Sequence, residues 1–405
     1  MIVSPDDHIV EPPNLWTSRL PSRYREAAPQ TKRLKGRGGI AQGWIKFELD
    51  DDGKECDVWF IEGEMVNPTL NFTISAGLSK EEINSDPMTF DEMRPSILLP
   101  SARLKSMDEA GIWASLCYPN MFVRFAGQRL SDIRDKELAL LSIRAYNDFV
   151  VEEWCAGSGG RLIPMCIVPL WDVQLAAAEI DRCAGLGFKA VTFSEGPHLL
   201  GLPSIHSGYW DPFFAACERN NIVIGLHFGT GGPHLMIAKE AIGAIQMVTP
   251  ALNQAHGMID MIFSGVLCRF PGLKVMFAES QVGWIPYILH RADTVWEETD
   301  QFVGIDKKVM SEPPSFYFDR NIWVTFFKDA VGLSMLDRVG SHKVLYETDF
   351  PHQDSSFPSC HDQAAKLTAD LSIEDARRLV AINACELLGL DVGSYVKSRS
   401  VLAAG

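Results

Sequence analysis

The chain has 405 residues, of which 46% are hydrophobic and 22% charged, a composition that excludes a disordered tail and a membrane channel. Its 37 Lys and Arg residues face 52 Asp and Glu residues, which gives a net charge of −15. Such a charge repels nucleic-acid phosphates and anionic lipids, so we expect neither nucleic acid nor membrane as a partner. At about 150 residues per domain the length suits two or three domains, or one large barrel with an insertion.

The segment Met1–Asp7 carries acid where a signal peptide would carry Lys or Arg, and no apolar run reaches the length of about 18 residues that would span a membrane. Nine cysteines are scattered along the chain without a Cys-x-x-Cys pair, a pattern typical of reduced thiols in a core. The sequence therefore predicts a cytoplasmic protein. Any metal must be bound by His, Asp and Glu.

Eight short apolar runs recur along the chain, each bounded by turn residues. Runs of this kind are typical of parallel strands that are buried on both faces, and helical patterns such as 173–184 and 212–220 lie between them. The alternation predicts an α/β fold, a (β/α)8 TIM barrel in which residues 1–405 form a single domain. A doubly wound open sheet is the alternative, but its first strand is more often followed by a Gly-rich turn. The runs are Ile2-Val3, Ile112–Tyr118, Leu162–Val168, Lys189–Phe193, Ile222–Leu226, Leu273–Ala278, Ile322–Phe327 and Lys343–Tyr346.

Two regions interrupt this alternation. Residues 31–100 predict an insertion after the first strand, near the barrel mouth, with a hairpin that pairs Trp44–Leu49 with Cys56–Ile61. Ala238–Arg269 predicts a long helical stretch whose apolar side chains serve either barrel packing or an interface between copies. We expect a homo-oligomer, in the form of a dimer.

Polar side chains close several of the apolar runs, and in a barrel these ends form the active site. Imidazole and carboxylate ligands together suit a divalent metal such as Zn, Fe or Mn, and a carboxylate can bridge two ions. Each residue also has a simpler explanation, such as a helix cap for Asp6, a core histidine for His227, or a salt bridge for Glu195. The candidates are Asp6, His8, Glu195, His227, Glu279 and Asp349.

Four motifs resemble the amidohydrolase superfamily, and within it the branch that includes aminocarboxymuconate-semialdehyde decarboxylase. They are Asp6–Pro12, Leu226-His227, Phe270–Glu279 and Glu347–His352. The resemblance covers nearly the whole chain and implies a metal-dependent TIM barrel with ligands on its first, fifth and eighth strands. It assigns those ligands to Asp6, His8, His227 and Asp349.

The chain departs from that branch at two positions. Where the branch has a first-strand His-x-His or Glu-x-His and a proton-shuttling His after the sixth strand, this chain has Asp6 and Glu279. A carboxyl with a pKa of about 4.3 is no acid at neutral pH unless burial raises that pKa, which counts against decarboxylation. A Glu at this point suits a second ion instead. The departures therefore predict a dinuclear site, with Asp6, His8 and Asp349 on one ion, His227 and Glu279 on the other, and Glu195 between them.

These residues favour a metal-dependent hydrolase that cleaves an amide, ester or thioester bond of a small organic acid derivative. A metal-activated water would attack the carbonyl, with Asp349 accepting its proton and Glu279 or His352 protonating the leaving group. The first alternative is a nonoxidative decarboxylase or C–C lyase of an aromatic or unsaturated acid, and the second is a barrel that binds a ligand without turnover. The residues expected to contact the small-molecule substrate are Arg124, His198, His206 and Trp210, beside the close backbone of Gly229–Gly232.

Overall fold

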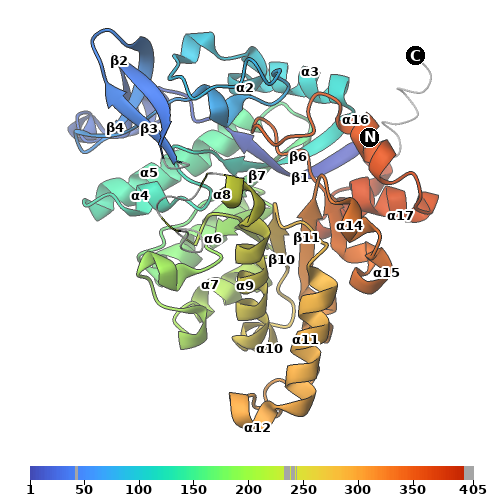
Figure 1. Ribbon diagram of the computed structural model, residues 1–405. Helices are drawn as coiled ribbons and strands as arrows, with labels where there is room; N and C mark the ends of the chain where they lie inside the picture. Colours follow the sequence, from blue (N-terminus) through green and yellow to red (C-terminus); the bar gives the residue numbers. More distant parts are fainter. Residues whose placement is uncertain (42–43, 232–237, 239–241, 243, 396–405) are drawn as a thin grey trace.

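The computed structural model describes residues 1–41, 44–231, 238, 242 and 244–395. Its centre is an eight-stranded parallel sheet in which the strands follow one another in chain order (Figure 1). Each of the eight predicted apolar runs forms one strand, so the α/β TIM barrel is confirmed. The strands are β1 (Ile2–Ile9), β6 (Ile112–Pro119), β7 (Leu162–Cys166), β8 (Ala190–Phe193), β9 (Val223–His227), β10 (Val275–Ala278), β11 (Ile322–Phe326) and β12 (Val344–Tyr346).

The segment after β12 closes the sheet against β1. The backbone N–H of Asp349 donates to the carbonyl of Asp6 at 2.9 Å, and the N–H of His8 donates to the carbonyl of Phe350 at 2.7 Å. These bonds align the first strand with the chain that follows the last strand. Three predicted metal ligands, Asp6, His8 and Asp349, therefore lie at the same rim of the barrel.

Two apolar layers hold the barrel together. The inner layer fills the barrel with strand side chains such as Val3, Leu116 and Met165, all fully or almost fully buried. The outer layer lies between the strands and the surrounding helices, as for the predicted helix 173–184, which is α6 (Val173–Gly185). Asp172 begins α6 by accepting hydrogen bonds from the N–H groups of its first turn.

The helices run around the outside of the strands (Figure 1). They are α1 (Leu15–Arg19), α2 (Pro95–Leu98), α3 (Pro100–Ala110), α4 (Gln128–Ser131), α5 (Lys136–Phe149), α7 (Asp211–Arg219), α8 (Ala244–Val248), α9 (Pro250–Phe263), α10 (Val266–Arg269), α11 (Ile285–Glu298), α12 (Asp300–Val303), α13 (Pro314–Asn321), α14 (Ala330–Leu333), α15 (Leu336–Val339), α16 (Cys360–Leu367), α17 (Ile373–Arg377) and α18 (Asn383–Leu388).

The stretch 238–269 is divided into α8, α9 and α10, and its residues 239–241 and 243 lie outside the described part of the chain. Pro250 begins the second of these helices, and Gly265, with a φ of 74°, separates it from the third. Met258 and Ile262 are completely buried in the outer layer. These side chains therefore serve barrel packing, and the dimer stays a prediction.

Residues 30–68 form a separate antiparallel sheet at one side of the barrel mouth, drawn in blue in Figure 1. It has the order β3 (Trp44–Leu49), β2 (Gln30–Ala41), β4 (Lys54–Ile61), β5 (Glu64–Pro68). The predicted pairing of 44–49 with 56–61 is wrong, because both segments pair with the longer strand β2 between them. The division of the chain into domains stays a prediction.

The physical reason for this different pairing lies in the glycines of β2. Gly36 pairs with both Leu49 and Lys54, so β2 passes from pairing with β4 to pairing with β3 at this residue. A Cβ at Gly36 would lie 2.3 Å from the Phe47 ring, and a Cβ at Gly53 would lie 2.5 Å from the Gly36 carbonyl oxygen. The chain therefore comes closer to itself here than larger residues would allow.

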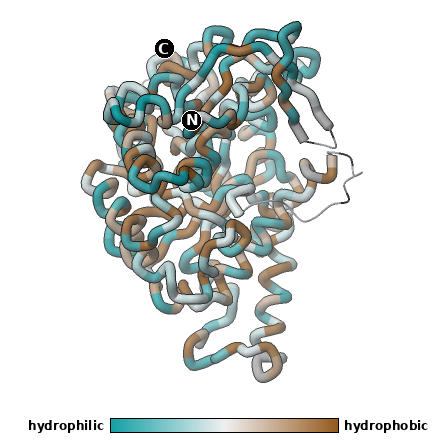
Figure 2. Tube along the Cα trace, turned by 90° about the vertical axis from the view of Figure 1, so that its left-hand side faces the viewer, coloured by the Kyte–Doolittle hydropathy of each residue, from teal (hydrophilic) through white to brown (hydrophobic). Residues whose placement is uncertain are grey.

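Apolar and polar segments alternate along most of the chain, as the colours of Figure 2 show. Among the residues that the structure describes, no helix has both the length and the apolar character needed to cross a bilayer.

Candidate metal centre

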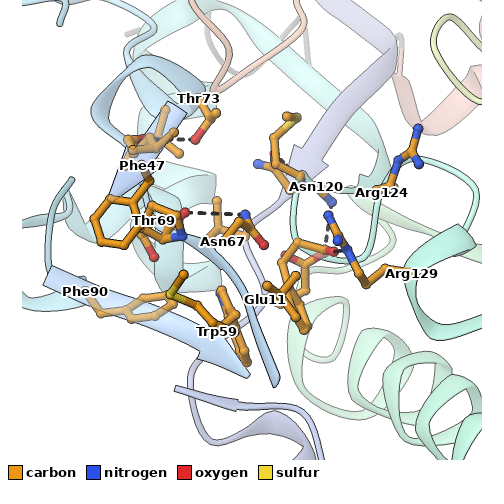
Figure 3. Close-up of a pocket in the computed structure, with 18 residues that line it drawn as sticks. Glu11, Phe47, Trp59, Asn67, Thr69, Thr73, Phe90, Asn120, Arg124 and Arg129 are labelled. Atoms are coloured by element: carbon orange, nitrogen blue, oxygen red, sulfur yellow. Dashed lines mark hydrogen bonds between the residues drawn. The ribbon is translucent and has the colours of Figure 1, made fainter. Parts of the chain in front are cut away.

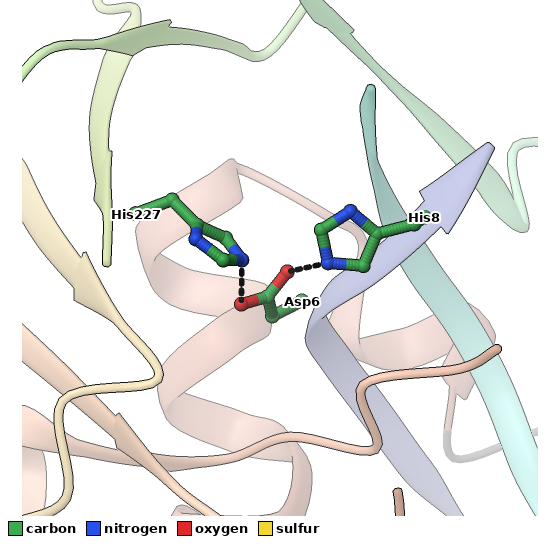
Figure 4. A group of neighbouring side chains, drawn as sticks. All are labelled: Asp6, His8 and His227. Carbon is green, nitrogen blue, oxygen red and sulfur yellow. Dashed lines mark ion pairs between the residues drawn. The ribbon is translucent and has the colours of Figure 1, made fainter. Parts of the chain in front are cut away.

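Three side chains from two strands meet inside the barrel mouth (Figure 4). The Nε2 atom of His8 lies 3.4 Å from Oδ1 of Asp6, and the Nε2 atom of His227 lies 3.5 Å from Oδ2 of the same carboxylate. Asp6 and His8 belong to β1 and His227 ends β9. All three residues are completely buried, and their ligand atoms lie close enough together to hold one ion.

A second group of possible ligands shares His8 with the first. Its Nε2 atom lies 3.3 Å from Oδ1 of Asp349, and that oxygen is 2.8 Å from Nδ1 of His352. The rings of His8 and His352 lie with their centroids 3.9 Å apart. The structure thus brings the four ligands implied by the resemblance to one place, with His352 at their edge.

The two buried histidines of the first group are oriented as metal ligands. Nδ1 of His8 lies 2.8 Å from the carbonyl of Pro119, and Nδ1 of His227 lies 2.7 Å from the carbonyl of Phe228. Because a carbonyl only accepts, each Nδ1 carries the proton and each Nε2 presents a lone pair. Among the residues that the structure describes, neither Nε2 atom has a hydrogen-bond partner, and the same holds for both carboxylate oxygens of Asp6. Buried polar atoms without partners are rare, and this donor set fits a divalent ion.

Burial sets the protonation of these groups. Desolvation lowers the pKa of His227 to about 3 and also holds the pKa of His8 well below its usual range, so both imidazoles are neutral. Desolvation, followed by the nearby carboxylates of Glu347 and Asp349, raises the pKa of Asp6. A dication at this point would reverse that rise, because positive charge favours the carboxylate form.

Glu279 lies beside the ligands, directly after β10. Its Oε2 atom is 3.8 Å from Nε2 of His227, and its backbone N–H donates to Oγ1 of Thr325 at 2.9 Å. The residue has a φ of 53°, an uncommon conformation outside glycine that is often found at functional sites. Burial and, second, the Asp349 carboxylate raise the pKa of Glu279. Its predicted role as a ligand or an acid stays a prediction.

Glu195 lies outside both ligand groups of the described residues. Its Oε1 atom accepts hydrogen bonds from the N–H groups of Gly229 at 3.0 Å and Gly231 at 3.4 Å. A Cβ at Gly231 would lie 2.9 Å from Cγ of Glu195, so the backbone comes close to this side chain, whereas Gly232 lies outside the described residues. Desolvation raises the pKa of Glu195 to about 7. Bridging between two ions stays a prediction for this residue.

The four expected substrate contacts lie in different places. Arg124 lines a cavity next to the ligands. His198 is exposed, and His206 is half-exposed and paired with Asp260. Trp210 is completely buried in the outer apolar layer, where its Nε1–H donates to the carbonyl of Pro203 at 2.7 Å. Of the four, Arg124 alone borders that cavity.

The cavity has a volume of about 340 Å³ and lies between the antiparallel sheet and the loop that follows β6 (Figure 3). Asn120 connects it to the ligand groups, because its Oδ1 atom is 3.3 Å from Nε2 of His352. A volume of this size is typical of small-molecule sites. The cavity therefore borders the second ligand group through the contact of Asn120 with His352.

The sequence did not single out three buried carboxyl groups around the site, which belong to Asp7, Glu347 and the cavity-lining Glu11. Asp7 accepts hydrogen bonds from Oγ1 of Thr348 and from the N–H of Phe350, so it ties β1 to the chain after β12. Glu347 is completely buried, and its Oε2 accepts from the N–H of Glu279 at 3.3 Å. Successive side chains of a strand point to opposite faces, so the sequence alone indicated that Asp7 points away from its neighbours Asp6 and His8. No comparable signal marked Glu347.

Comparison with known proteins gives the family. The family model Amidohydro_2, described as amidohydrolase, matches residues 89–390. The chain belongs to this amidohydrolase family. Gamma-resorcylate decarboxylase of Rhodococcus jostii (strain RHA1) is 27% identical to the amidohydrolase described here, over 75% of this chain and 91% of the relative.

Two solved structures share the fold. An amidohydrolase from Mycobacterium avium subsp. paratuberculosis K-10 superposes with a TM-score of 0.72 at 21% identity, covering 96% of this chain and 98% of its own. Dihydroxybenzoic acid decarboxylase from Polaromonas sp. JS666, solved with bound manganese, has a TM-score of 0.58 at 21% identity, with coverage of 74% and 89%.

These findings correct the predicted activity. The hydrolase and thioesterase prediction is wrong, because the relative that aligns along most of this amidohydrolase is a decarboxylase. The prediction rested on the absence of an acid at neutral pH where the branch has a histidine. The physical error was to give Glu279 the pKa of an exposed carboxyl, whereas burial raises it.

Proposed function

We propose that this amidohydrolase is a metal-dependent nonoxidative decarboxylase of a small aromatic or unsaturated carboxylic acid. The observation that carries the proposal is the alignment with gamma-resorcylate decarboxylase over 91% of that enzyme. The buried set of Asp6, His8 and His227 supports it, since imidazole and carboxylate ligand atoms this close together suit a divalent ion.

We assign one divalent ion to the site, with Mn²⁺ as the first choice, held by Asp6, His8, His227 and Asp349. Two observations favour one ion over two. The two ligand groups share His8, and the side chain of Glu195 is already bound to the backbone of the 229–231 turn. When bound, the ion supplies positive charge that orients an acidic substrate and stabilises the electrons that remain after the carboxylate leaves.

The reaction breaks the bond between a carbon atom and its carboxylate group. Carbon dioxide leaves, the electron pair stays on the carbon, and a proton supplied by the protein forms the new C–H bond. We assign delivery of that proton to His352, whose Nδ1 lies 2.8 Å from Oδ1 of Asp349. His352 is 14% exposed while Asp349 is 1% exposed, so the imidazole is the group between the buried centre and the cavity.

Aromatic rings surround the imidazoles and keep bulk water away from them. The Phe125 ring lies 4.2 Å from the His227 ring and 4.9 Å from the His8 ring, measured between centroids. Tyr118 packs on the other side, and its hydroxyl would lie 2.2 Å from a Cβ at Gly225. A site without bulk water strengthens each electrostatic interaction with the leaving carboxylate.

The setting of the enzyme is part of the proposal. We propose a cytoplasmic homodimer that takes a small-molecule substrate, supported by its nine free cysteines, of which seven are buried. Size-exclusion chromatography with light scattering at micromolar concentration tests the dimer, and a mass of one chain would contradict it.

The test of the activity uses the full chain loaded with Mn²⁺ and a carboxyl-¹³C-labelled 2,6-dihydroxybenzoate. We expect labelled CO2 and, in D2O, one deuterium on the product carbon that lost the carboxylate. A chelated sample is the control and should release none. Turnover of p-nitrophenyl acetate without CO2 release from any aromatic acid would contradict the proposal.

A further inference from the structure

The cavity next to the metal centre is formed mostly by the chain's own insertion. Eleven of its eighteen lining residues lie between Phe47 and Phe90. Ten of these eleven, all but Phe90, precede the segment that the family model matches, which begins at residue 89. The insertion therefore decides the shape of the space in front of the ligands. The volume of this cavity and the side chains at its two ends indicate which substrates it can hold.

One end of the cavity is aromatic and apolar. Trp59 and Phe122 stack with their ring centroids 4.0 Å apart, and Phe90 meets Trp59 edge-on at 6.0 Å. Phe47 lies across from them in Figure 3. Met65 is 45% exposed and Met121 is 43% exposed, so two flexible side chains border the apolar space.

The other end carries two guanidinium groups. Arg124 and Arg129 line this end of the cavity, and Figure 3 shows Arg129 next to Glu11, with Arg124 farther from the aromatic rings. Within the described part of the chain, neither guanidinium lies within ion-pair distance of a carboxylate, although Asp132 contributes at longer range. The Nε–H of Arg129 donates to the carbonyl of Phe122, which leaves its terminal N–H groups free for another partner. Arg124 has a φ of 63°, an uncommon conformation for its residue type.

Charge and volume together define what fits. In a chain with 15 more acidic than basic residues, two neighbouring arginines that form no ion pair among the described residues favour an anionic ligand. Glu11 also lines the cavity, where its Oε1 accepts a hydrogen bond from the N–H of Asn120 and burial raises its pKa to about 7. A cavity of about 150 Å³ holds one benzene molecule, so the 340 Å³ observed here accommodate a body of about two rings.

We propose that the insertion and the 120–129 loop form a subsite for a bicyclic acid that carries a second anionic group, which Arg124 and Arg129 bind. The inference rests on the proposed function, in that the leaving carboxylate is placed at the metal centre. The second anion stays on the product. The substrate class is thus a fused or linked two-ring dicarboxylic acid, larger than the one-ring acid of the relative.

Equilibrium binding tests the subsite without requiring turnover. The probes are naphthalene-2,6-dicarboxylate, 2-naphthoate and benzoate, titrated calorimetrically into the full chain loaded with Mn²⁺. We expect affinity to fall in that order, with at least about a tenfold step when the second carboxylate is removed. Equal affinity for the three probes would overturn the proposal.

Two variants locate the binding. R124Q and R129Q should each reduce the affinity for the dicarboxylate about tenfold and leave that for 2-naphthoate nearly unchanged. R134Q is the matched control, because Arg134 is exposed and pairs with Glu62 and Glu64, and it should bind all probes as the wild type does. Loss of affinity for both naphthalene acids in R124Q and R129Q alike would contradict the assigned role of the arginines.

A readout that does not depend on these variants is the methyl resonance of ¹³C-labelled methionine. The signals of Met65 and Met121, assigned by Leu substitution, should shift on adding the naphthalene probes, whereas that of exposed Met247 should not. Shifts absent from Met65 and Met121 would overturn the subsite. Should the probes bind as expected while no acid releases CO2, the subsite stands and the proposed function fails.

Discussion

The metal centre and the antiparallel sheet beside it are built in opposite ways. The ligand side chains are at most 1% exposed, and neighbouring backbone carbonyls fix their rings. The sheet of residues 30–68 instead carries exposed ion pairs such as Arg33 with Asp91, which contribute little each to stability. The barrel thus fixes the buried ligand side chains, whereas the insertion lines most of the cavity beside them. Changes in the first region should act on metal and rate, and changes in the second on substrate affinity.

The largest effect is expected from removing a ligand. His227→Ala takes away one of the two neutral imidazoles, so bound Mn²⁺ and CO2 release should fall together by more than about 100-fold, the upper range for losing a partner outside the ligand shell. Elemental analysis and a CO2 assay measure both. The exposed His198→Ala is the matched control and should keep metal and rate. Full metal content in His227→Ala would remove this residue from the ligand set.

Next in size is the loss of the proposed proton donor. His352→Gln keeps a polar side chain next to Asn120 but cannot exchange a proton with Asp349. CO2 release should fall by about 10²- to 10⁴-fold, as is typical of lost acid–base catalysis, with Mn²⁺ content unchanged. Loss of metal in step with rate would instead identify His352 as a ligand of the second group.

A smaller effect is expected in the insertion. Gly53→Val places a Cβ 2.5 Å from the Gly36 carbonyl oxygen and should disrupt the pairing of β2 at this residue, whereas the Cβ of Gly39→Ala, in the same sheet, meets no described atom within 4 Å. We expect KM for the acid to rise in Gly53→Val with Mn²⁺ content unchanged, and no change in Gly39→Ala. Equal kinetics of the two variants would show that the sheet does not shape the substrate site.

The smallest effect is expected from replacing Glu195, which should change how the free energy of unfolding depends on pH. Its pKa is raised from 4.5 to about 7 in the folded chain, so the folded state holds a proton that the unfolded state has already lost. The stability that this residue contributes is fully present below pH 4.5 and is lost as the pH rises through 7. Glu195→Gln keeps an acceptor for Gly229 and has no charge to bury. Between pH 5 and 8 the variant should gain about 1–3 kcal/mol relative to the wild type in urea unfolding. If the difference in unfolding free energy between the variant and the wild type stayed constant from pH 5 to 8, it would contradict the buried, protonated state of Glu195.

The barrel could be predicted from the sequence because its strands are apolar on both faces and alternate with helices. Few other folds are compatible with that pattern, and it also determines which strand ends lie together at the barrel mouth. Asp6, His8, His227 and Asp349 follow directly from their places at those ends. The activity could not be predicted in the same way, because the sequence argument gave Glu279 the pKa of an exposed carboxyl, and burial is a property of the folded chain.

The position of the insertion could be predicted from the sequence, but the pairing of its strands could not. Its strands 44–49 and 56–61 have nearly the predicted bounds, yet a short turn between them suggested a hairpin that the structure lacks. Pairing on both sides of β2 depends on close contacts at Gly36, which no local pattern shows. Likewise, the position of Trp210 in the core and of Glu195 on a backbone turn results from long-range packing.

The most direct test of a single metal-bound centre at the barrel mouth is an anomalous difference map from crystals grown with Mn²⁺. We predict one peak per chain, enclosed by Asp6, His8, His227 and Asp349, with elemental analysis giving one equivalent. Two peaks, with Glu195 or Glu279 bound to the second, or a single peak away from His8 and His227, would contradict the account.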